Sequence, residues 1–214
     1  FISQVPGRMQ RLGSKNTPKI FVDYAHTPDA LKKALETLKK QTDGNLICIF
    51  GCGGERDTGK RKDMAEVASK IADINFITSD NPRNENPKNI INEISKHMKG
   101  SYHIEFDRHN AIKKAIKHAK KNDVILIAGK GHEIYQEIKG VRYPFSDQKY
   151  AKKALKTYKA HWMNLTLNQV KKIVGGTYHG DAVLLKKRIK RISINTDSGL
   201  VQPFYIIDER NSEI

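Results

Sequence analysis

The chain has 214 residues, enough to bury a sizeable core, and this length suggests one domain plus a fragment or two small domains. Its formal charge of +16 would suit a nucleic-acid-binding protein, but most basic residues are lysines spread along amphipathic helices, and the aromatics form no stacking platform. We therefore expect no nucleic-acid partner. We also expect no membrane partner, because no apolar stretch reaches the roughly 18 residues of a span. The two cysteines are too few for a zinc cage or a disulfide framework, and indicate a reducing, cytoplasmic setting.

Apolar runs typical of strands alternate with helical patterns in the first 160 residues. The predicted strands are Ile20–Val22, Leu46–Phe50, Ile74–Thr78, His103–Phe106 and Val124–Ala128. The predicted helices are Pro28–Lys40, Met64–Ile71, Pro87–Met98, Ala111–Ala119 and Asp147–His161, with a hairpin of Ile134–Ile138 and Val141–Tyr143 before the last helix. Thr27 and Asp107 are predicted helix caps. This alternation predicts an α/β fold with a Rossmann-like, mostly parallel sheet and helices on both faces.

Polar loops follow four of the predicted strands. They are Asp23–Pro28, Gly51–Asp57, Asp80–Arg83 and Gly129–Glu133. Ligands of such sheets bind at the carboxyl ends of the strands, where these four loops would converge. The sequence therefore predicts a functional site at that edge of the sheet.

The loop Asp80–Arg83 has the composition of a stiff turn that could hold a zwitterion. Pro82 fixes its own φ and biases Asn81 away from the helical region. Asp80 would accept an ammonium group, Arg83 a carboxylate in a two-pronged grip, and Asn81 either partner. The alternative interpretation is a helix-capping loop with a surface ion pair.

The loop after the second predicted strand matches the first seven positions of a Walker A motif. Arg61 stands at the eighth position, where a hydroxyl should meet magnesium, so the nucleotide-binding interpretation is weak. We expect instead that the glycines let the backbone approach a ligand while Arg56 directs a charge at it. A flexible loop without a ligand is the alternative.

Two further loops carry candidate ligand groups. Glu133 could hold an ammonium group, and His132 is either a base or a structural residue. Asp23 follows the first predicted strand directly and could bond the hydroxyls of a sugar.

The character of the sequence changes around Met163, where the pattern resembles the start of a separate protein. We predict a boundary near Trp162, with one domain over residues 1–160 and a short α+β tail fragment over residues 163–214. The tail is too short to form a stable domain by itself.

Residues 5 to about 158 resemble the C-terminal domain of the Mur ligases, specifically the diaminopimelate-adding (MurE) type. The signatures that carry the resemblance occur in the family's order, and together they are specific. They are Gly7-Arg8-Met9, Asp23–Pro28, Gly51–Arg61, Asp80–Arg83 and Gly129–Glu133.

The resemblance implies a function in peptidoglycan precursor synthesis. In that family ATP phosphorylates the D-glutamate γ-carboxylate of UDP-N-acetylmuramoyl-L-alanyl-D-glutamate, and the amine of meso-diaminopimelate then attacks the acyl phosphate. Binding of meso-diaminopimelate is implied for Arg56, Asp80, Asn81, Pro82, Arg83, Gly129 and Glu133. Arg8 and Asp23 would approach the ATP ribose. The sequence identifies no catalytic residue and no metal ligand.

Some family features are missing from this sequence. The P-loop, the magnesium ligands and a modified lysine of the family belong to a central domain, so ATP and Mg²⁺ would be held mainly outside this chain, which we expect to be inactive in isolation. The tail resembles the start of the D-alanyl-D-alanine-adding (MurF) type, although Gly199 stands where an arginine is usual. Two alternatives remain: a related ligase with another acceptor, such as lysine or polyglutamate, and a non-catalytic nucleic-acid-binding domain.

Overall fold

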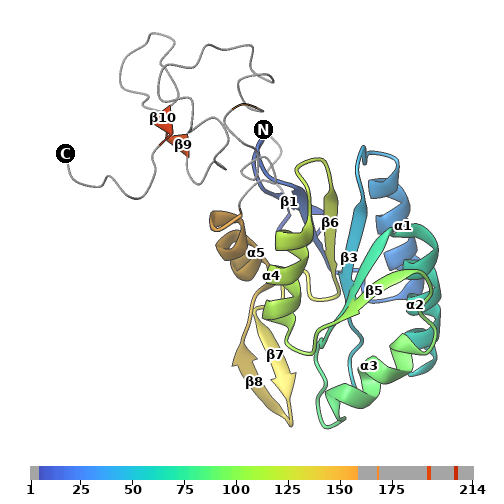
Figure 1. The fold of residues 1–214 in the computed structure, drawn as a ribbon. Helices are drawn as coiled ribbons and strands as arrows, with labels where there is room; N and C mark the ends of the chain where they lie inside the picture. The colour runs from blue at the N-terminus through green and yellow to red at the C-terminus, as the bar shows by residue number, and fades with distance from the viewer. Residues whose placement is uncertain (1–4, 159–167, 169–191, 194–204, 207–214) are drawn as a thin grey trace. The chain divides into compact units, whose positions relative to one another are not determined.

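The computed structural model describes residues 5–158, 168, 192–193 and 205–206. The chain divides into two units, residues 1–158 and residues 159–214, and each is considered by itself. In the first unit, five parallel strands and one antiparallel strand form a sheet (Figure 1). In chain order the strands are β1 (Gln10–Leu12), β2 (Lys19–Asp23), β3 (Leu46–Phe50), β4 (Ile74–Ile77), β5 (Ser101–Ile104) and β6 (Val124–Ala128), and their order across the sheet is β1-β2-β6-β3-β4-β5.

The two central strands are buried along their whole length. Every residue of β3 and β6 is buried, as their uninterrupted apolar sequences predict for strands covered on both faces. Alternate residues of these strands point into two separate cores, one on each face of the sheet.

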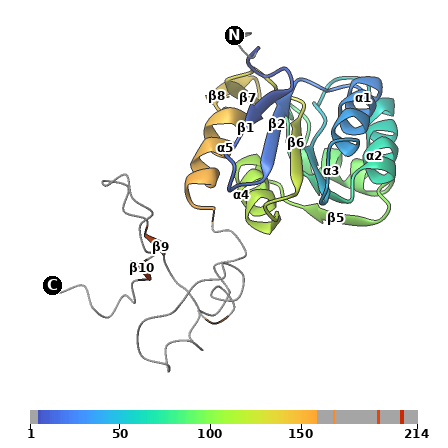
Figure 2. The ribbon, with the colours of Figure 1, turned by 90° about the horizontal axis from the view of Figure 1, so that it is seen from above.

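Helices cover both faces, which confirms the predicted fold class. The helices α1 (Pro28–Lys39), α2 (Gly59–Ile71) and α3 (Pro87–Ser95) pack on one face, and α4 (Arg108–His118) and α5 (Asp147–Lys156) on the other (Figures 1 and 2). Thr27 and Asp107 cap α1 and α4 as predicted, each accepting a hydrogen bond from a backbone N–H of the first turn. Apolar residues at helical spacing, with leucines in α1 and isoleucines in α3, face the sheet.

The predicted hairpin is present as β7 (Tyr135–Ile138) and β8 (Val141–Pro144), paired antiparallel outside the main sheet. It lies against the loop that follows β4. The Arg83 N–H donates to the Glu137 carbonyl at 3.1 Å, and the Lys139 N–H donates to the Arg83 carbonyl at 2.7 Å. The hairpin therefore supports the backbone of the Asp80–Arg83 turn.

Several elements differ from the sequence prediction. The helices α3 and α5 end earlier than predicted, at Ser95 and Lys156 rather than at Met98 and about His161. The strand β1 was not predicted, because Gln10-Arg11-Leu12 contains no apolar run. It is a strand because it pairs antiparallel with β2. The strand β5 begins and ends two residues earlier than predicted; all four of its residues are exposed at the sheet edge, so burial gives no signal there. The helix α2, predicted around Met64–Ile71, already begins at Gly59; the apolar pattern gave no sign of its first turn because that turn is polar.

In the second unit the structure describes two short strands, β9 (Ile192–Ser193) and β10 (Tyr205–Ile206), which pair antiparallel. The rest of the predicted tail fragment lies outside the described residues, so its assignment stays a prediction. Among the described helices, none combines the length and the apolar character that crossing a membrane requires.

Candidate functional site

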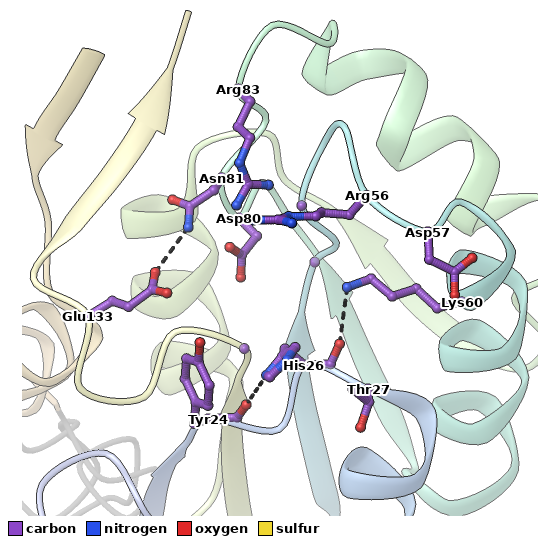
Figure 3. A pocket seen from close by; sticks show the side chains of 13 residues that line it. Tyr24, His26, Thr27, Arg56, Asp57, Lys60, Asp80, Asn81, Arg83 and Glu133 are labelled. Carbon is purple, nitrogen blue, oxygen red and sulfur yellow. Dashed lines mark hydrogen bonds between the residues drawn. The ribbon is translucent and has the colours of Figure 1, made fainter. Parts of the chain in front are cut away.

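A cavity of about 410 Å³ opens at the carboxyl edge of the parallel sheet, where the sequence predicted a site (Figure 3). It is lined by residues from the loops that follow β2, β3, β4 and β6. These are Tyr24, His26, Thr27, Gly51, Gly53, Arg56, Asp57, Lys60, Asp80, Asn81, Arg83, Gly129 and Glu133. The predicted residues Asp80, Asn81 and Arg83 from the turn after β4, and Gly129 and Glu133 from the loop after β6, therefore meet in one place. Pro82 and His132 do not line the cavity.

One side of the cavity is acidic and cross-linked by hydrogen bonds. Asp80 and Asn81 are buried, and the Asn81 amide Nδ2 donates to Glu133 Oε2 at 3.0 Å (Figure 3). Lys130, whose side chain is fully buried, donates from Nζ to Asn81 Oδ1 at 2.7 Å and to Glu133 Oε2 at 3.1 Å. Its ammonium also lies 3.7 Å from Asp80 Oδ1. Two loops that are distant in sequence, those after β4 and β6, are thereby tied together.

The backbone of the Asp80–Arg83 turn is held in a conformation that it would not adopt alone. Arg83 has a φ of 51°, which is unfavourable for a residue with a side chain. Its pairing with the hairpin strand β7 maintains that conformation, as does the hydrogen bond from Gln136 Nε2 to the Asp80 carbonyl at 2.6 Å. The Arg83 guanidinium donates from Nη1 to the Gly54 carbonyl at 2.7 Å, and its Nε lies 3.9 Å from Glu137 Oε2. The guanidinium is thus aimed into the cavity from a fixed base.

Gly129 is required by the same arrangement. Its φ is 116°, and a Cβ built there would lie only 2.6 Å from Asp80 Oδ2. A side chain at this position would displace the Asp80 carboxylate. The glycine predicted from the sequence as a binding residue therefore acts in this structure by leaving room for Asp80.

The opposite side of the cavity comes from the loop after β3 and is more open. Arg56 and Asp57 are exposed, and Figure 3 shows Arg56 extending towards the middle of the cavity. Lys60 is half-buried, and its ammonium donates to the His26 carbonyl at 3.3 Å.

The eighth position of the Walker A look-alike is occupied by an ion-paired arginine. Arg61 is almost fully buried, and its guanidinium donates to Glu85 at 2.8 Å and to Glu93 at 2.6 Å. Burial alone would lower the pKa of Arg61, but these two carboxylates raise it. The eighth position of the motif thus supplies neither a hydroxyl nor an available cation.

Arg8 and Asp23 lie together at the end of β2. The Asp23 carboxylate accepts hydrogen bonds from the Met9 N–H at 2.7 Å and the Ala25 N–H at 2.9 Å. The Arg8 guanidinium lies over the Tyr24 ring, 5.0 Å from its centroid. Asp23 therefore fixes the N-terminal segment to the sheet, a structural role that the sequence did not indicate.

A second buried cation lies beneath the cavity. The Arg108 guanidinium donates to both oxygens of Asp147 at 2.8 Å and to the Ala128 carbonyl, at the end of β6, at 2.9 Å. Both side chains of this ion pair are 0% exposed. Burial alone would lower the pKa of Arg108, but the charge and hydrogen bonds of Asp147, together with the charges of Asp80 and Glu133, raise that pKa.

Neither cysteine is suited to act as a nucleophile. Cys48 and Cys52 are both free and buried. Burial raises the pKa of Cys52 to about 12, and that of Cys48 above its ordinary range as well. In the described residues, no group of three or more His, Cys, Asp or Glu side chains is placed to hold a metal ion.

Sequence reasoning missed the groups that position the site rather than line it. Lys130 lies inside a motif that the sequence singled out, and a lysine between two glycines directly after a buried strand was an available signal. Gln136 and Glu137 lie in a hairpin strand that carried no other sign of function. The Arg108–Asp147 pair joins residues 39 positions apart, and no local pattern indicates it.

The chain resembles known proteins throughout this unit. Residues 7–131 match the family model for the Mur ligase, glutamate ligase domain. A UDP-N-acetylmuramoyl-L-alanyl-D-glutamate–2,6-diaminopimelate ligase of Pseudomonas putida is 53% identical over 156 residues, and the enzyme of the same name in Coxiella burnetii is 51% identical over 156 residues. Each alignment covers 72% of this chain but only 32% of the relative.

Solved structures agree with these matches. The structure of a UDP-N-acetylmuramoyl-L-alanyl-D-glutamate–2,6-diaminopimelate ligase superposes with a TM-score of 0.68 and 42% identity, over 73% of this chain and 32% of that one. A murein peptide ligase from Psychrobacter arcticus, at 24% identity and a TM-score of 0.53 over 72% of this chain and 31% of that one, shares the fold. The family match covers more than half of the chain and spans the residues that line the cavity except Glu133, and so the chain belongs to the Mur ligase family.

Proposed function

We propose that this chain supplies the amino-acid-binding domain of an ATP-dependent ligase that adds meso-diaminopimelate to UDP-N-acetylmuramoyl-L-alanyl-D-glutamate. The chain spans about a third of the length of the curated relatives with that name, so the activity is that of the larger assembly of domains. The observation that carries the proposal is the charge pattern of the cavity: the Arg83 guanidinium and the carboxylates Asp80 and Glu133 line the same space.

The distal end of meso-diaminopimelate carries one ammonium and one carboxylate. The carboxylates of Asp80 and Glu133 would accept hydrogen bonds from the ammonium, and the Arg83 guanidinium would donate to the carboxylate. Arg56 extends into the same cavity and could donate to a second carboxylate of the ligand. Asn81 and Gly129 keep the two acidic side chains in place.

Held in this way, the amino acid would present its other amine to the acyl group that is being transferred. The contribution of this domain is positioning, which can lower a barrier by several kcal/mol without chemical participation by the side chains. ATP would supply the activation of the D-glutamate carboxylate, and Arg8 and Asp23 would lie near its ribose. The phosphates and Mg²⁺ would be bound by other domains, and the ion-paired Arg61 supports this part of the proposal.

We also propose a cytoplasmic setting and a second ligase fragment. The free, buried thiols of Cys48 and Cys52 support a reducing compartment. The support for a MurF-type start after Met163 is the sequence pattern that includes Ile194–Ser198, and limited proteolysis would test the boundary. Cleavage should fall between residues 159 and 164 or within the tail, and a tail as resistant as the core would contradict the boundary.

The binding proposal is tested by calorimetric titration of the 214-residue chain with meso-diaminopimelate and with L-lysine. Lysine lacks the distal carboxylate and would leave Arg83 without its partner. Loss of a hydrogen bond between charged groups costs about 1.5–3 kcal/mol, so diaminopimelate should bind roughly ten- to a hundredfold more tightly. Tighter binding of lysine would favour the lysine-adding alternative. The nucleic-acid-binding alternative would be favoured if the chain bound neither amino acid but bound random-sequence DNA with micromolar affinity that falls steeply with salt.

Activity is tested with a chimera in which residues 5–158 replace the matching segment of the Pseudomonas putida relative. The chimera should release phosphate from ATP in the presence of the UDP-dipeptide and diaminopimelate. The isolated 214-residue chain should stay at background. Turnover by the isolated chain would contradict our interpretation of residues 54–61.

A further inference from the structure

Lys130 is the one lysine among the described residues whose side chain is fully buried, and it lies beside the cavity without lining it. A buried ammonium is strongly unfavourable unless it is paired and hydrogen-bonded. Its partners are all side chains that line the cavity: Asn81 at 2.7 Å, Glu133 at 3.1 Å and Asp80 at 3.7 Å. The lysine is therefore built into the acidic side of the site.

The contacts of Lys130 fix the orientation of the groups that face a ligand. It donates to Asn81 Oδ1, which also accepts from the Glu137 N–H at 2.9 Å, so the Asn81 amide can direct only its Nδ2 towards Glu133. Both bonds to Glu133 reach the same oxygen, Oε2. The other oxygen, Oε1, keeps its full capacity to accept from a ligand.

Lys130 also sets the charge of this side of the cavity. Asp80 and Glu133 carry two negative charges, and the ammonium leaves one of them uncompensated. The neighbouring cation Arg108 is already neutralised by Asp147, and Arg83 has Glu137 as its own neighbour. The ring of Tyr135, whose centroid is 5.7 Å from the Lys130 ammonium, is uncharged. One residual negative charge matches one ammonium group.

We propose that Lys130 is a positioning and specificity-determining residue: it holds Asn81 and Glu133 for the ligand and limits the acidic side to the charge of a single ammonium. This inference rests on the proposed function, namely that the cavity takes the zwitterionic end of diaminopimelate. The distal end of diaminopimelate is neutral as a whole, whereas that of lysine carries a full positive charge. The buried ammonium therefore disfavours lysine more than diaminopimelate.

The test is the ratio of the two dissociation constants, lysine over diaminopimelate, measured by calorimetry on the 214-residue chain. Lys130→Met removes the charge and preserves most of the volume. Two carboxylates then remain uncompensated, which favours the cationic ligand, and the ratio should fall roughly tenfold for a charge several ångströms away at intermediate dielectric. Lys130→Arg keeps the charge and should retain the wild-type ratio, whatever its effect on the separate affinities.

A charge-count series separates this role from a merely structural one. Lys130→Met combined with Glu133→Gln restores a single negative charge, so the ratio should return towards that of the wild type. Glu133→Gln alone leaves no net charge and should raise the ratio above that of the wild type. If Lys130→Met alone does not fold, as judged from its ¹H–¹⁵N spectrum, the double variant is compared with Glu133→Gln. These two proteins differ only in the Lys130 ammonium, so the ratio should be lower in the double variant. Lys113→Met removes the same charge from an exposed position of α4 and should leave the ratio unchanged.

The outcomes distinguish two failures. Equal losses of affinity for both ligands in Lys130→Met, with no restoration in the double variant, would show that Lys130 only supports the fold, and the inference would be wrong while the proposed function stood. Failure of the wild-type chain to bind either amino acid would overturn the proposed function, and this inference with it.

Discussion

The two sides of the cavity differ in how firmly the chain holds them. On the acidic side Asp80 and Asn81 are buried, and the Lys130 ammonium joins them to Glu133. On the side of the loop after β3, Arg56 is exposed and extends into the cavity (Figure 3). Both sides are charged, but only the acidic side is built into the core.

This difference indicates which side of the cavity should contribute most to the affinity for a ligand. A group that is already held in place loses little conformational freedom when a ligand binds, whereas an exposed arginine loses about 0.5–1.5 kcal/mol of side-chain entropy on being ordered. The acidic side and Arg83 should therefore dominate both affinity and selectivity. The loop after β3 should add less, and its contribution should depend more on salt.

The largest expected effect is on the free energy of unfolding, and it comes from the buried ion pair of Arg108 and Asp147. Asp147→Ala leaves the Arg108 guanidinium buried without its partner, which should destabilise the chain by about 3–5 kcal/mol. Urea unfolding followed by circular dichroism measures this loss. The control is Asp29→Ala, which breaks a pair with Lys33 whose side chains are 74% and 75% exposed, and this should cost less than about 0.5 kcal/mol. Similar losses in both variants would contradict the importance of the buried pair.

Arg83→Ala tests the fixed cation of the site. It should weaken meso-diaminopimelate binding roughly ten- to a hundredfold, since a hydrogen bond between charged groups contributes about 1.5–3 kcal/mol. Lysine has no distal carboxylate, so its affinity should fall much less. The variant should therefore discriminate less between diaminopimelate and lysine. Calorimetry of both ligands measures this, with Arg142→Ala in the exposed hairpin strand β8 as the control. Equal losses for the two ligands would mean that Arg83 is a structural residue.

Sequence alone could predict the frame and the loops that meet at the site, for identifiable physical reasons. Buried central strands need long apolar runs, and helices that pack on them need apolar spacing and caps such as Thr27 and Asp107. In a parallel sheet all strands end at one edge, so the convergence of Asp80 and Glu133 followed from topology.

Contacts between distant residues could not be predicted in this way. The strand β1 exists through its partner β2, and Arg61 became a structural residue because Glu85 and Glu93 lie beside it. Asp23 illustrates the same limit. Its position after a strand indicated a ligand group, but its two backbone hydrogen bonds depend on where the N-terminal segment passes.

Arg56→Ala tests the open side of the cavity and should have a smaller effect than Arg83→Ala. A charge-assisted hydrogen bond from Arg56, reduced by the entropy of ordering the side chain, leaves about 1 kcal/mol, or roughly fivefold in diaminopimelate affinity. The effect should shrink as NaCl is raised from 50 to 500 mM, because exposed charges are screened, whereas that of Arg83→Ala should persist. A loss as large as that of Arg83→Ala would show that the loop is ordered before the ligand arrives.

Glu137→Gln should have the smallest effect, and in the opposite direction. The Glu137 carboxylate lies 3.9 Å from Arg83 Nε, in a pair whose side chains are 20% and 23% exposed, so it competes with a ligand carboxylate for the guanidinium. Its removal should strengthen diaminopimelate binding about two- to fivefold, the range of a partly screened ion pair, and should not strengthen lysine binding. Glu66→Gln, on the exposed side of α2, is the control for the loss of one negative charge. Weaker diaminopimelate binding in Glu137→Gln would mean that Glu137 holds Arg83 in its productive orientation instead of competing for it, and the selectivity of the site would then depend on the hairpin side chain as well as on the turn.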